Sequence, residues 1–389
     1  MAEQTFTTAQ TARLLGVKAE TVYAYVSRGL LSRTRAADGR TSLFDAGEVR
    51  RLAARNRRGA PESGPIETTL TVIRDGSLYY RGQDAAHLAG TTTFEAVTSL
   101  LWTGKLDDGA TLVSSAPVRE LACAVVRPLA GHARPVDLLP VIVGAAATAD
   151  PLRYDVDPAI VVGTGRALLA VMVDALPSHL DTGPTEPLGV RLWAALTARE
   201  PDEDGVRALG AALVLLADHD LASSTMAVRT AASTRAHPYA VVATGLGALD
   251  GPAHGAAAET VRRFLRGAAE LDDPMAAVVE RVRDTGDVPG FGEPLYPDGD
   301  PRATRLLELV RTPGPVRSTV DDLVAARPGM RPNVDAALAV LAEAYDMVPG
   351  AGETIRAIGR TAGWLAHALE EYRERPNRFR PRGFYTGAP

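Results

Sequence analysis

Short runs of apolar residues at helical spacing open the chain. Thr8–Leu15 is predicted to form one helix, and Ala19–Arg28 a second one with apolar positions at i, i+3 and i+4. A Gly-Val pair interrupts the pattern between them, and Gly29 stands at the stop position of the second helix. Two short helices joined by a glycine turn predict a helix-turn-helix.

The pattern then becomes extended and more polar. The stretch LLSRTRAADGRTSLFD holds Asp38-Gly39 between two short extended runs, which predicts a hairpin or wing. A third helix is expected over Ala46–Arg57. Proline and glycine interrupt all periodicity directly afterwards. Residues 59–66 are therefore predicted to be a linker, with the boundary between two domains near residue 60.

A different pattern begins at Ile66. The run IETTLTVIRDGSLYYRG alternates apolar and polar residues around Asp75-Gly76, which predicts a small hairpin. Helical patterns dominate the rest, with almost no strand pattern between them and no repeat of solenoid length. This part is predicted to be mainly α-helical. Examples of the expected helices are Thr93–Trp102, Pro117–Leu129, Arg166–Leu176, Gly205–Asp218, Ala256–Leu271, Arg302–Val310, Val334–Tyr345 and Glu353–Tyr372.

Composition narrows the class of protein. The 389 residues are 46% hydrophobic and 23% charged, the balance of a globular protein with two or three domains. Cys123 is the single cysteine, so an internal disulfide is excluded and a reducing cytoplasm is expected. The most apolar stretch, Leu138 to Thr148, is too short to cross a membrane, and no signal-peptide pattern is visible.

Charge divides the chain at the same place as the pattern. Residues 1–58 contain eleven Lys and Arg against five Asp and Glu, whereas the remainder holds 31 basic and 42 acidic residues. A basic part followed by an acidic part indicates two modules with different partners. The basic part, over TTAQTARLLGVKAETVYAYVSRGLL and the wing after it, resembles helix-turn-helix domains of the MerR and excisionase type.

This resemblance implies that the second helix enters the major groove of duplex DNA while the wing contacts the backbone. One copy makes few phosphate contacts, so useful affinity would need a dimer. Two other interpretations stay open: a small appendage with a basic, solvated face, and an oligomerisation or folding module. The residues expected to face DNA are Lys18, Thr21, Tyr23, Arg28, Arg33, Arg35 and Arg40.

Four polar clusters interrupt the helices of the acidic part. His219 follows a long apolar helix, and His254 lies among Gly and Pro in DGPAHGAA, where a ligand can approach closely. The loop GFGEPLYPDGDPR carries Glu293 and Arg302. Asp335 comes just inside a helix start, where the helix dipole stabilises its charge. Taken singly, each cluster has an ordinary structural explanation.

In order and spacing, the clusters together resemble the citrate synthase family, of the compact bacterial type, over roughly residues 66–389. The motifs that carry the resemblance are GSLYYRG, LADHDLASSTMAVRTAAST, GALDGPAHGAAAETV, GFGEPLYPDGDPRA, RPNVDAAL and GRTAGWLAHALEE. The resemblance implies an all-α fold preceded by the small winged helix-turn-helix domain of residues 1–58. Its large domain would comprise residues 67–256 and 351–389, and its small domain residues 257–350.

Members of this family are homodimers that condense an acyl-CoA, usually acetyl-CoA, with an α-keto acid, usually oxaloacetate. The resemblance implies that Asp335 removes the proton next to the thioester. His254, as a neutral imidazole, would donate a hydrogen bond to the thioester oxygen. The residues implied to contact the keto acid are His219, Arg302, Arg360 and Arg380, the last across the dimer. Arginine suits carboxylates because it pairs with them bidentately; the alternative for each is an ordinary ion pair.

One residue departs from the family pattern. Histidine normally follows Gly-Phe-Gly and polarises the keto oxygen, whereas this chain has Glu293. A carboxylate cannot donate a hydrogen bond, although a protonated Glu293 could do so. The alternatives are a weakened site, a different electrophile, or an inactive paralogue.

Two functions are therefore carried forward. The first is a citrate synthase-type acyltransferase, a transferase of the tricarboxylic acid cycle, in which His254, Asp335 and Glu293 form the catalytic set. The alternative is a catalytically impaired paralogue that binds DNA and senses a metabolite. No metal site is expected, and no cofactor beyond CoA as substrate and product.

Overall fold

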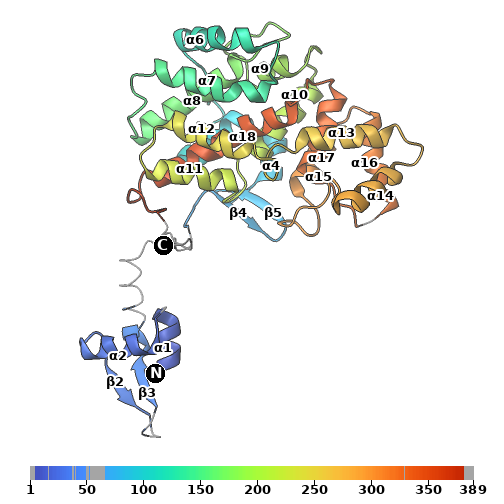
Figure 1. Cartoon of the computed structure of the whole chain (residues 1–389). Helices are drawn as coiled ribbons and strands as arrows, with labels where there is room; N and C mark the ends of the chain where they lie inside the picture. The colour runs from blue at the N-terminus through green and yellow to red at the C-terminus, as the bar shows by residue number, and fades with distance from the viewer. Residues whose placement is uncertain are drawn as a thin grey trace, which may run out of the picture. The chain divides into compact units, whose positions relative to one another are not determined.

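The computed structural model describes residues 5–15, 17–36, 39, 41–49, 52, 66–327 and 329–380. The chain divides into two compact units, one of Met1–Ile66 with Arg378–Pro389 and one of Glu67–Asn377 (Figure 1). We call the described residues between 5 and 52 the head, and Glu67–Asn377 the body. Within the described ranges, no helix is both long enough and apolar enough to span a membrane.

The head combines two helices with a small antiparallel sheet. Helices α1 (Thr8–Leu15) and α2 (Ala19–Ser27) are followed by β2 (Arg33–Arg35) and β3 (Ser42–Asp45). Strand β1 (Thr5–Thr7) completes the sheet, whose order is β1-β3-β2. One apolar cluster holds these elements together. Its buried side chains are Val22, Leu31, Phe44, Val49 and Leu52.

The predicted elements of the head are largely confirmed. The first helix has the expected ends, the second ends one residue early at Ser27, and β2 pairs with β3 as the expected hairpin. Of the third predicted helix, residues 46–49 and 52 are helical. The rest of that helix, Asp38, Arg40 and linker residues 59–65 lie outside the described residues. The winged helix-turn-helix class of the head stays a prediction.

The body opens with a second three-stranded antiparallel sheet. It consists of β4 (Thr71–Arg74), β5 (Ser77–Tyr80) and β6 (Gln83–Asp84), in that order. The Asp75-Gly76 turn joins β4 to β5, which confirms the predicted hairpin. The prediction of an all-α fold needs a correction, because the fold is mostly helical but carries a small sheet in the head and another in the body.

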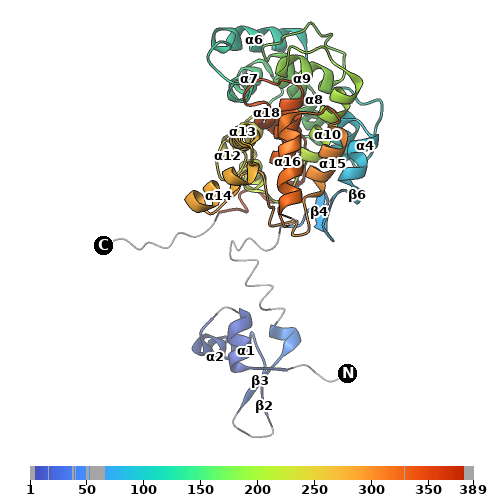
Figure 2. The same ribbon diagram turned by 90° about the vertical axis from the view of Figure 1, so that its right-hand side faces the viewer.

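Helices make up most of the body (Figures 1 and 2). The first are α4 (Ala85–Thr91), α5 (Phe94–Thr103), α6 (Ala116–Val126) with the 3₁₀ turn η1 (Arg127–Leu129), α7 (Pro135–Ala149), α8 (Pro158–Asp174) and α9 (Leu188–Leu196). The next are α10 (Glu203–Leu216), α11 (Ser223–Ser233), α12 (Pro238–Leu249) and α13 (Ala258–Ala269). The last are α14 (Pro274–Thr285), α15 (Pro301–Leu309), α16 (Pro315–Ala326), α17 (Val334–Ala344) and α18 (Ala351–Glu371).

The largest error in the predicted helix boundaries concerns α8. This helix begins at Pro158, well before the predicted start at Arg166. Glycine and β-branched residues weaken the helical pattern in between. Local capping overrides them, because the Asp157 side chain accepts a hydrogen bond from Ala159 N and proline occupies the first helical position. Most other predicted ends agree within a few residues.

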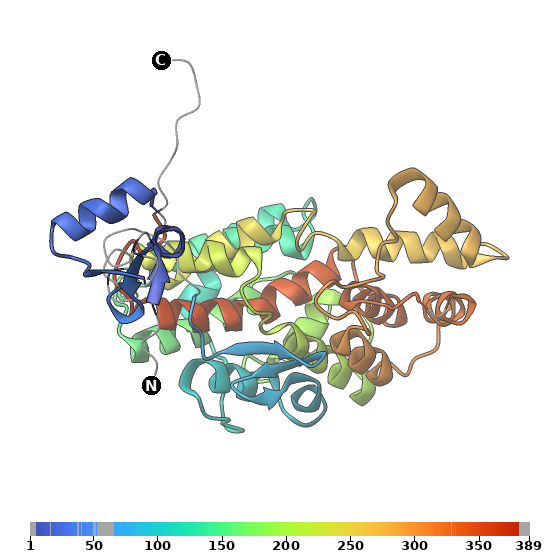
Figure 3. The same ribbon diagram turned by 90° about the horizontal axis from the view of Figure 1, so that it is seen from below.

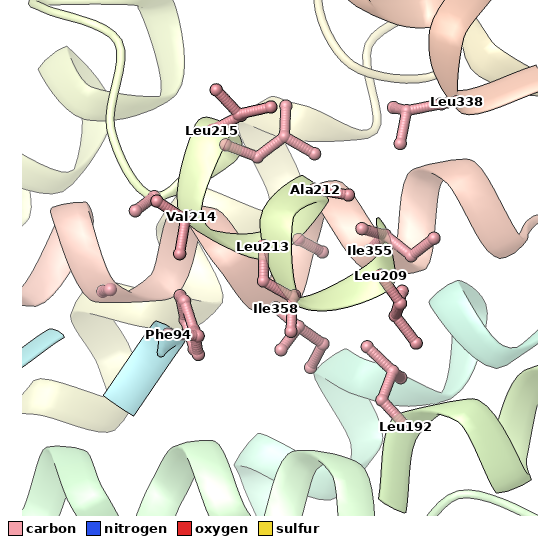
Figure 4. Packing of buried hydrophobic residues seen from close by; sticks show 14 of the residues in the cluster. Phe94, Leu192, Leu209, Ala212, Leu213, Val214, Leu215, Leu338, Ile355 and Ile358 are labelled. Carbon is pink, nitrogen blue, oxygen red and sulfur yellow. The ribbon is translucent and has the colours of Figure 1, made fainter. Parts of the chain in front are cut away.

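Helix α18 runs through the middle of the body (Figure 3) and packs against α5, α7, α8, α10, α11, α12, α13 and α17. Figure 4 shows Leu209 and Leu213 of α10 beside Ile355 and Ile358 of α18. Close contact depends on Gly363, where a Cβ atom would lie 2.4 Å from the Ala217 carbonyl oxygen. The small residues of this helix therefore let polar side chains of α18 approach the end of α10.

Helices α13 to α17 gather on one side of the body (Figures 1 and 2). Helix α13 packs against α14, α16 and α17, and α15 packs against α17. These helices fall within the residues expected to form a small domain. Glu67–Asn377 is a single unit in the structure, so the division into large and small domains stays a prediction.

Candidate active site

Two loops of the predicted site are joined by backbone hydrogen bonds. Gly292 N donates to the Arg331 carbonyl oxygen over 2.8 Å, and Asn333 N donates to the Gly290 carbonyl oxygen over 2.9 Å. The Asn333 side chain adds a 3.0 Å bond to the Gly292 carbonyl oxygen and also caps α17. Gly290 has a φ of +87°, and a Cβ there would lie 2.6 Å from Val261. The loop before Glu293 is thus fixed beside the helix start that carries Asp335.

Arg302 is anchored inside the body by an aspartate two residues before it. Its Nε and Nη2 donate to the two carboxylate oxygens of Asp300 over 2.9 and 2.8 Å. Asp300 also accepts from the backbone N–H of Arg302 and from Val334 N, so it ties α15 to α17. Burial disfavours the charged form, but Asp300 outweighs it and raises the pKa of Arg302. Arg302 is therefore a fixed, permanently charged guanidinium.

Glu293 lies on the same arginine. Its Oε2 is 3.5 Å from Arg302 Nη2, and its side chain is one quarter exposed. Its Oε1 accepts a 3.4 Å hydrogen bond from Leu295 N, two residues further along the loop. Glu293, at the position where the resemblance implies a histidine, therefore pairs with a cation that the resemblance implies binds the substrate.

His219 is buried beside the same loop. Its Nε2 lies 3.0 Å from the Tyr296 hydroxyl, whose ring also faces the Arg302 guanidinium. Burial and the positive charges of Arg302, Arg360 and Arg356 lower the pKa of His219 far below its usual range. His219 is accordingly neutral, and it contacts this cluster through Tyr296.

His254 occupies the turn after α12 and faces the start of α11. Its Nε2 is 2.8 Å from Ser224 Oγ and 3.3 Å from Ser224 N. The backbone N–H can only donate, and Trp364 Nε1 donates to the same hydroxyl over 3.3 Å. This network assigns Nε2 of His254 as an acceptor and leaves the ring proton on Nδ1. Burial, with the charges of Arg360 and Arg356, lowers the pKa of His254, which favours the neutral donor that the resemblance implies.

Asp335 forms an ion pair that its position in the sequence does not predict. Its Oδ1 accepts a short hydrogen bond from Nη2 of Arg356 on α18, and both side chains are largely buried. Arg356 lies near both histidines, since its charge contributes to the lowered pKa of each. Its spacing of four residues from Arg360, one helical turn apart, was the available signal.

Arg360 differs from the other two arginines. Its side chain is 2% exposed, and its Nε donates to the Leu216 carbonyl oxygen over 2.9 Å. Among the described residues, no carboxylate lies within ion-pair distance of Arg360. Burial lowers the pKa of Arg360 to about 10, and the charge of Asp218, which raises it, does not offset this effect.

Asp218 belongs to a separate buried network behind Arg360. It accepts from Thr71 over 2.5 Å and from His367 Nε2 over 3.0 Å. His367 Nδ1 in turn accepts from Arg229, which pairs with Glu370. Oδ1 of Asp218 is buried without a hydrogen-bond partner among the described residues. Asp218 thus holds the segment before His219 in place.

The structure therefore groups most of the predicted site in one place. Mutual effects on pKa and direct contacts place His219, His254, Arg302 and Arg360 near one another, with Glu293 on a neighbouring loop and Asp335 in the first turn of α17. Arg380 is exposed and falls outside the body, so its predicted role is not tested. Of the predicted DNA-facing residues, Thr21 is half-buried. The exposed ones are Lys18, Tyr23, Arg28, Arg33 and Arg35.

Comparison with known proteins identifies the class of the body. The family model described as citrate synthase, C-terminal domain, matches residues 62–382. The chain belongs to the citrate synthase family, and it is an enzyme of the citrate synthase type, a transferase.

Named relatives agree with this class. Citrate synthase 2 of Bacillus subtilis is 28% identical over 353 residues, which cover 83% of this chain and 94% of that protein. Citrate synthase of Haloferax volcanii is 30% identical over 343 residues, which cover 80% and 90%. A citrate synthase of Thermoplasma acidophilum, solved as a ternary complex with carboxymethyl coenzyme A and oxaloacetate, has the same fold. Its TM-score is 0.69 at 22% identity, covering 84% of this chain and 95% of that one.

Proposed function

We propose that the protein condenses an acyl-CoA with an α-keto acid and releases free CoA. Acetyl-CoA and oxaloacetate, giving citrate, are the first pair to test, with propionyl-CoA and 2-methylcitrate next. The observation that carries this proposal is the hydrogen-bond network of His254, which leaves Nδ1–H as a donor on a neutral ring. A neutral donor stabilises an enol without surrendering its proton fully.

In this reaction Asp335 takes the proton from the carbon next to the thioester. His254 donates to the thioester oxygen as the enol forms, a contribution of ~3–4 kcal/mol for a preorganised donor. The enol then attacks the keto carbon, and hydrolysis of the thioester releases CoA. Arg356 contacts Oδ1 of Asp335, which leaves Oδ2 to accept the proton. Arg360 supplies the buried cation that binds an acceptor carboxylate.

Release of free thiol from acetyl-CoA tests this proposal. Asp335→Asn keeps the shape of the side chain but removes the base, so kcat should fall by about 10²–10⁴-fold. The kcat of His254→Gln should fall by a similar factor. The kcat of Glu293→His, measured in the same assay, shows whether the histidine of the family pattern raises turnover. Absence of CoA release with every keto acid, from folded native protein, contradicts the proposal.

A homodimer is part of the proposed function. Leu121 and Val125 of α6 and Leu129 of η1 are exposed apolar side chains on successive turns. A row of this kind suits burial against a second copy. Sedimentation of the native protein and of Leu121→Glu/Val125→Glu tests it, with dissociation of the variant expected. A native monomer contradicts the proposal.

We further propose that the head binds duplex DNA. Its support is a cluster of exposed cations on neighbouring elements, with Lys18 and Arg28 flanking α2, and Arg33 and Arg35 on β2. Exposed Tyr23 of α2 lies 5.7 Å from the Arg33 guanidinium, which joins helix and strand into one face. Phosphate contacts from this face would be strongly salt-dependent.

Fluorescence anisotropy with labelled duplex DNA at several salt concentrations tests the second proposal. Arg33→Glu/Arg35→Glu should weaken binding at least tenfold at low salt, whereas exchange of an exposed body arginine, Arg283→Glu, should change it less than twofold. Equal binding by both variants contradicts the proposal. The CoA-release assay on the same proteins shows whether the two functions are separable.

A further inference from the structure

Three guanidinium groups converge on the candidate active site, and they differ in what they contact. Arg302 pairs with both Asp300 and Glu293. Arg356 pairs with Asp335. Only Arg360 has no carboxylate within ion-pair distance among the described residues. Asp218, the acid whose charge acts most strongly on Arg360, already accepts hydrogen bonds from Thr71 and His367.

The three arginines share their carboxylates unevenly: Arg302 faces both Asp300 and Glu293, Arg356 faces Asp335, and Arg360 faces none of them. Both histidines stay neutral because their pKa values are lowered. A site in this state has one uncompensated cation, Arg360, available to an incoming anion. A ligand with one carboxylate matches this arrangement, whereas a second carboxylate has to share a cation with Glu293.

Glu293 is held beside Arg302, the cation that the family resemblance implies binds a substrate carboxylate. The backbone bonds of Gly290, Gly292 and Asn333 fix the preceding loop, and Leu295 N holds Oε1. The second oxygen, Oε2, then faces Arg302 Nη2 at 3.5 Å. Asp300 is buried and accepts hydrogen bonds from Nε and from the same Nη2 of this guanidinium. An entering carboxylate at Arg302 would meet both negative charges in a region of low dielectric constant.

We propose that the Glu293 carboxylate takes the place of one acceptor carboxylate on Arg302, so that the acceptor selected by this site is an α-keto monocarboxylate. This inference rests on the proposed condensation and names its acceptor class. The acceptor's single carboxylate binds Arg360, and its keto carbon receives the enol. The acyl-CoA loses one proton to Asp335, one carbon–carbon bond forms, and water cleaves the thioester. The products are a 2-hydroxydicarboxylic acid and CoA.

Steady-state kinetics with acetyl-CoA and three acceptors tests the inference. The acceptors are glyoxylate and pyruvate, with one carboxylate each, and oxaloacetate, with two. Native protein should give a kcat/KM at least tenfold higher for the better monocarboxylate than for oxaloacetate. Glu293→Gln keeps the shape and removes the charge, so it should shift this ratio at least tenfold towards oxaloacetate.

A matched control is Glu308→Gln. Glu308 is exposed and pairs with Arg305 on α15, the helix that carries Arg302, but it does not contact the site. In Glu308→Gln, the ratio of kcat/KM for the monocarboxylate to kcat/KM for oxaloacetate should stay within twofold of the native value. Circular dichroism checks that each variant is folded, and Glu293→Ala serves as a second neutral variant. A native preference for oxaloacetate, or an unchanged ratio in folded Glu293→Gln and Glu293→Ala, overturns the inference.

A binding measurement separates this inference from the proposed function. Calorimetric titration of pyruvate and oxaloacetate without acyl-CoA reports recognition of the acceptor, whether or not chemistry follows. Tighter binding of pyruvate by native protein, reversed in Glu293→Gln, supports the inference even when no CoA is released. Absence of CoA release alone contradicts only the condensation. Tighter native binding of oxaloacetate, or binding of neither acid, overturns the inference.

Discussion

Arg302 and Arg360 are equally buried, yet the protein treats them in opposite ways. Arg302 is bidentate with Asp300 and also faces Glu293, whereas Arg360, among the residues that the structure describes, hydrogen-bonds to a backbone carbonyl oxygen of α10 alone. Their pKa values move in opposite directions, up for Arg302 and down for Arg360. A paired arginine contributes to the architecture, while an unpaired one stores unfavourable burial that an anionic ligand can relieve.

The largest effect is expected at the paired arginine. Arg302→Met leaves Asp300 charged and buried without its partner, which should lower the free energy of unfolding by about 3–5 kcal/mol. Urea denaturation measures this loss. The double variant Arg302→Met/Asp300→Asn should recover most of it, because neither charge then remains. If the double variant is no more stable than the single one, Arg302 does not act through this pair.

The next effect separates activity from stability. Arg360→Met should reduce kcat/KM for the keto acid by at least ~30-fold, since truncating one partner of a buried charge pair costs about 2–5 kcal/mol. Its free energy of unfolding should change by no more than ~1 kcal/mol, because the native protein offers Arg360 no carboxylate. The same CoA-release and urea experiments test it. A loss of stability equal to that of Arg302→Met would show that Arg360 is also a structural arginine, which contradicts the difference between the two residues.

A third effect follows from the lowered pKa of His219. The unfolded chain binds a proton on this histidine below about pH 6.5, whereas the native protein does not. Stability should therefore fall as pH drops below that value, by ~1.4 kcal/mol per pH unit. His219→Gln removes this contribution, so its stability should depend less on pH between 6.5 and 5.

Urea denaturation at several pH values measures that slope. The exposed His132 gives a matched control, and His132→Gln should keep the native pH dependence. An equal slope in native protein and His219→Gln would show that His219 is protonated in the folded state, which would remove the neutral histidine from the charge balance around Arg302 and Arg360.

The smallest effect is expected for a solvent-exposed arginine of the head. Arg33 is exposed on β2 and contacts the face of Tyr23. Arg33→Ala should change the free energy of unfolding of the head by no more than ~0.5 kcal/mol, and CoA release by less than twofold. Thermal unfolding measures the first and the thiol assay the second. A large loss of stability would place Arg33 among the structural arginines with Arg302.

Much of the fold follows from patterns that are local in the chain. The helix at Thr8–Leu15, the hairpin around Asp75-Gly76 and the helix start at Val334 agree with the structure because turns and caps act over a few residues. The predicted start of α8 was wrong because Asp157 and Pro158 begin the helix at residue 158, although the helical pattern that follows them is weak. The predicted all-α class left out the two small sheets. Their strands are only two to four residues long, so they produce little alternation in the sequence.

The sequence by itself determined the family, the order of the site motifs and the candidates His254, Asp335 and Arg360. It did not determine which charges are already neutralised. The pairs Arg356–Asp335 and Arg302–Glu293 join residues 21 and nine positions apart. Only the packing of α18 and the fixed Gly290 loop bring these pairs into contact, because ion pairing depends on distances of a few ångströms that no spacing in the chain encodes.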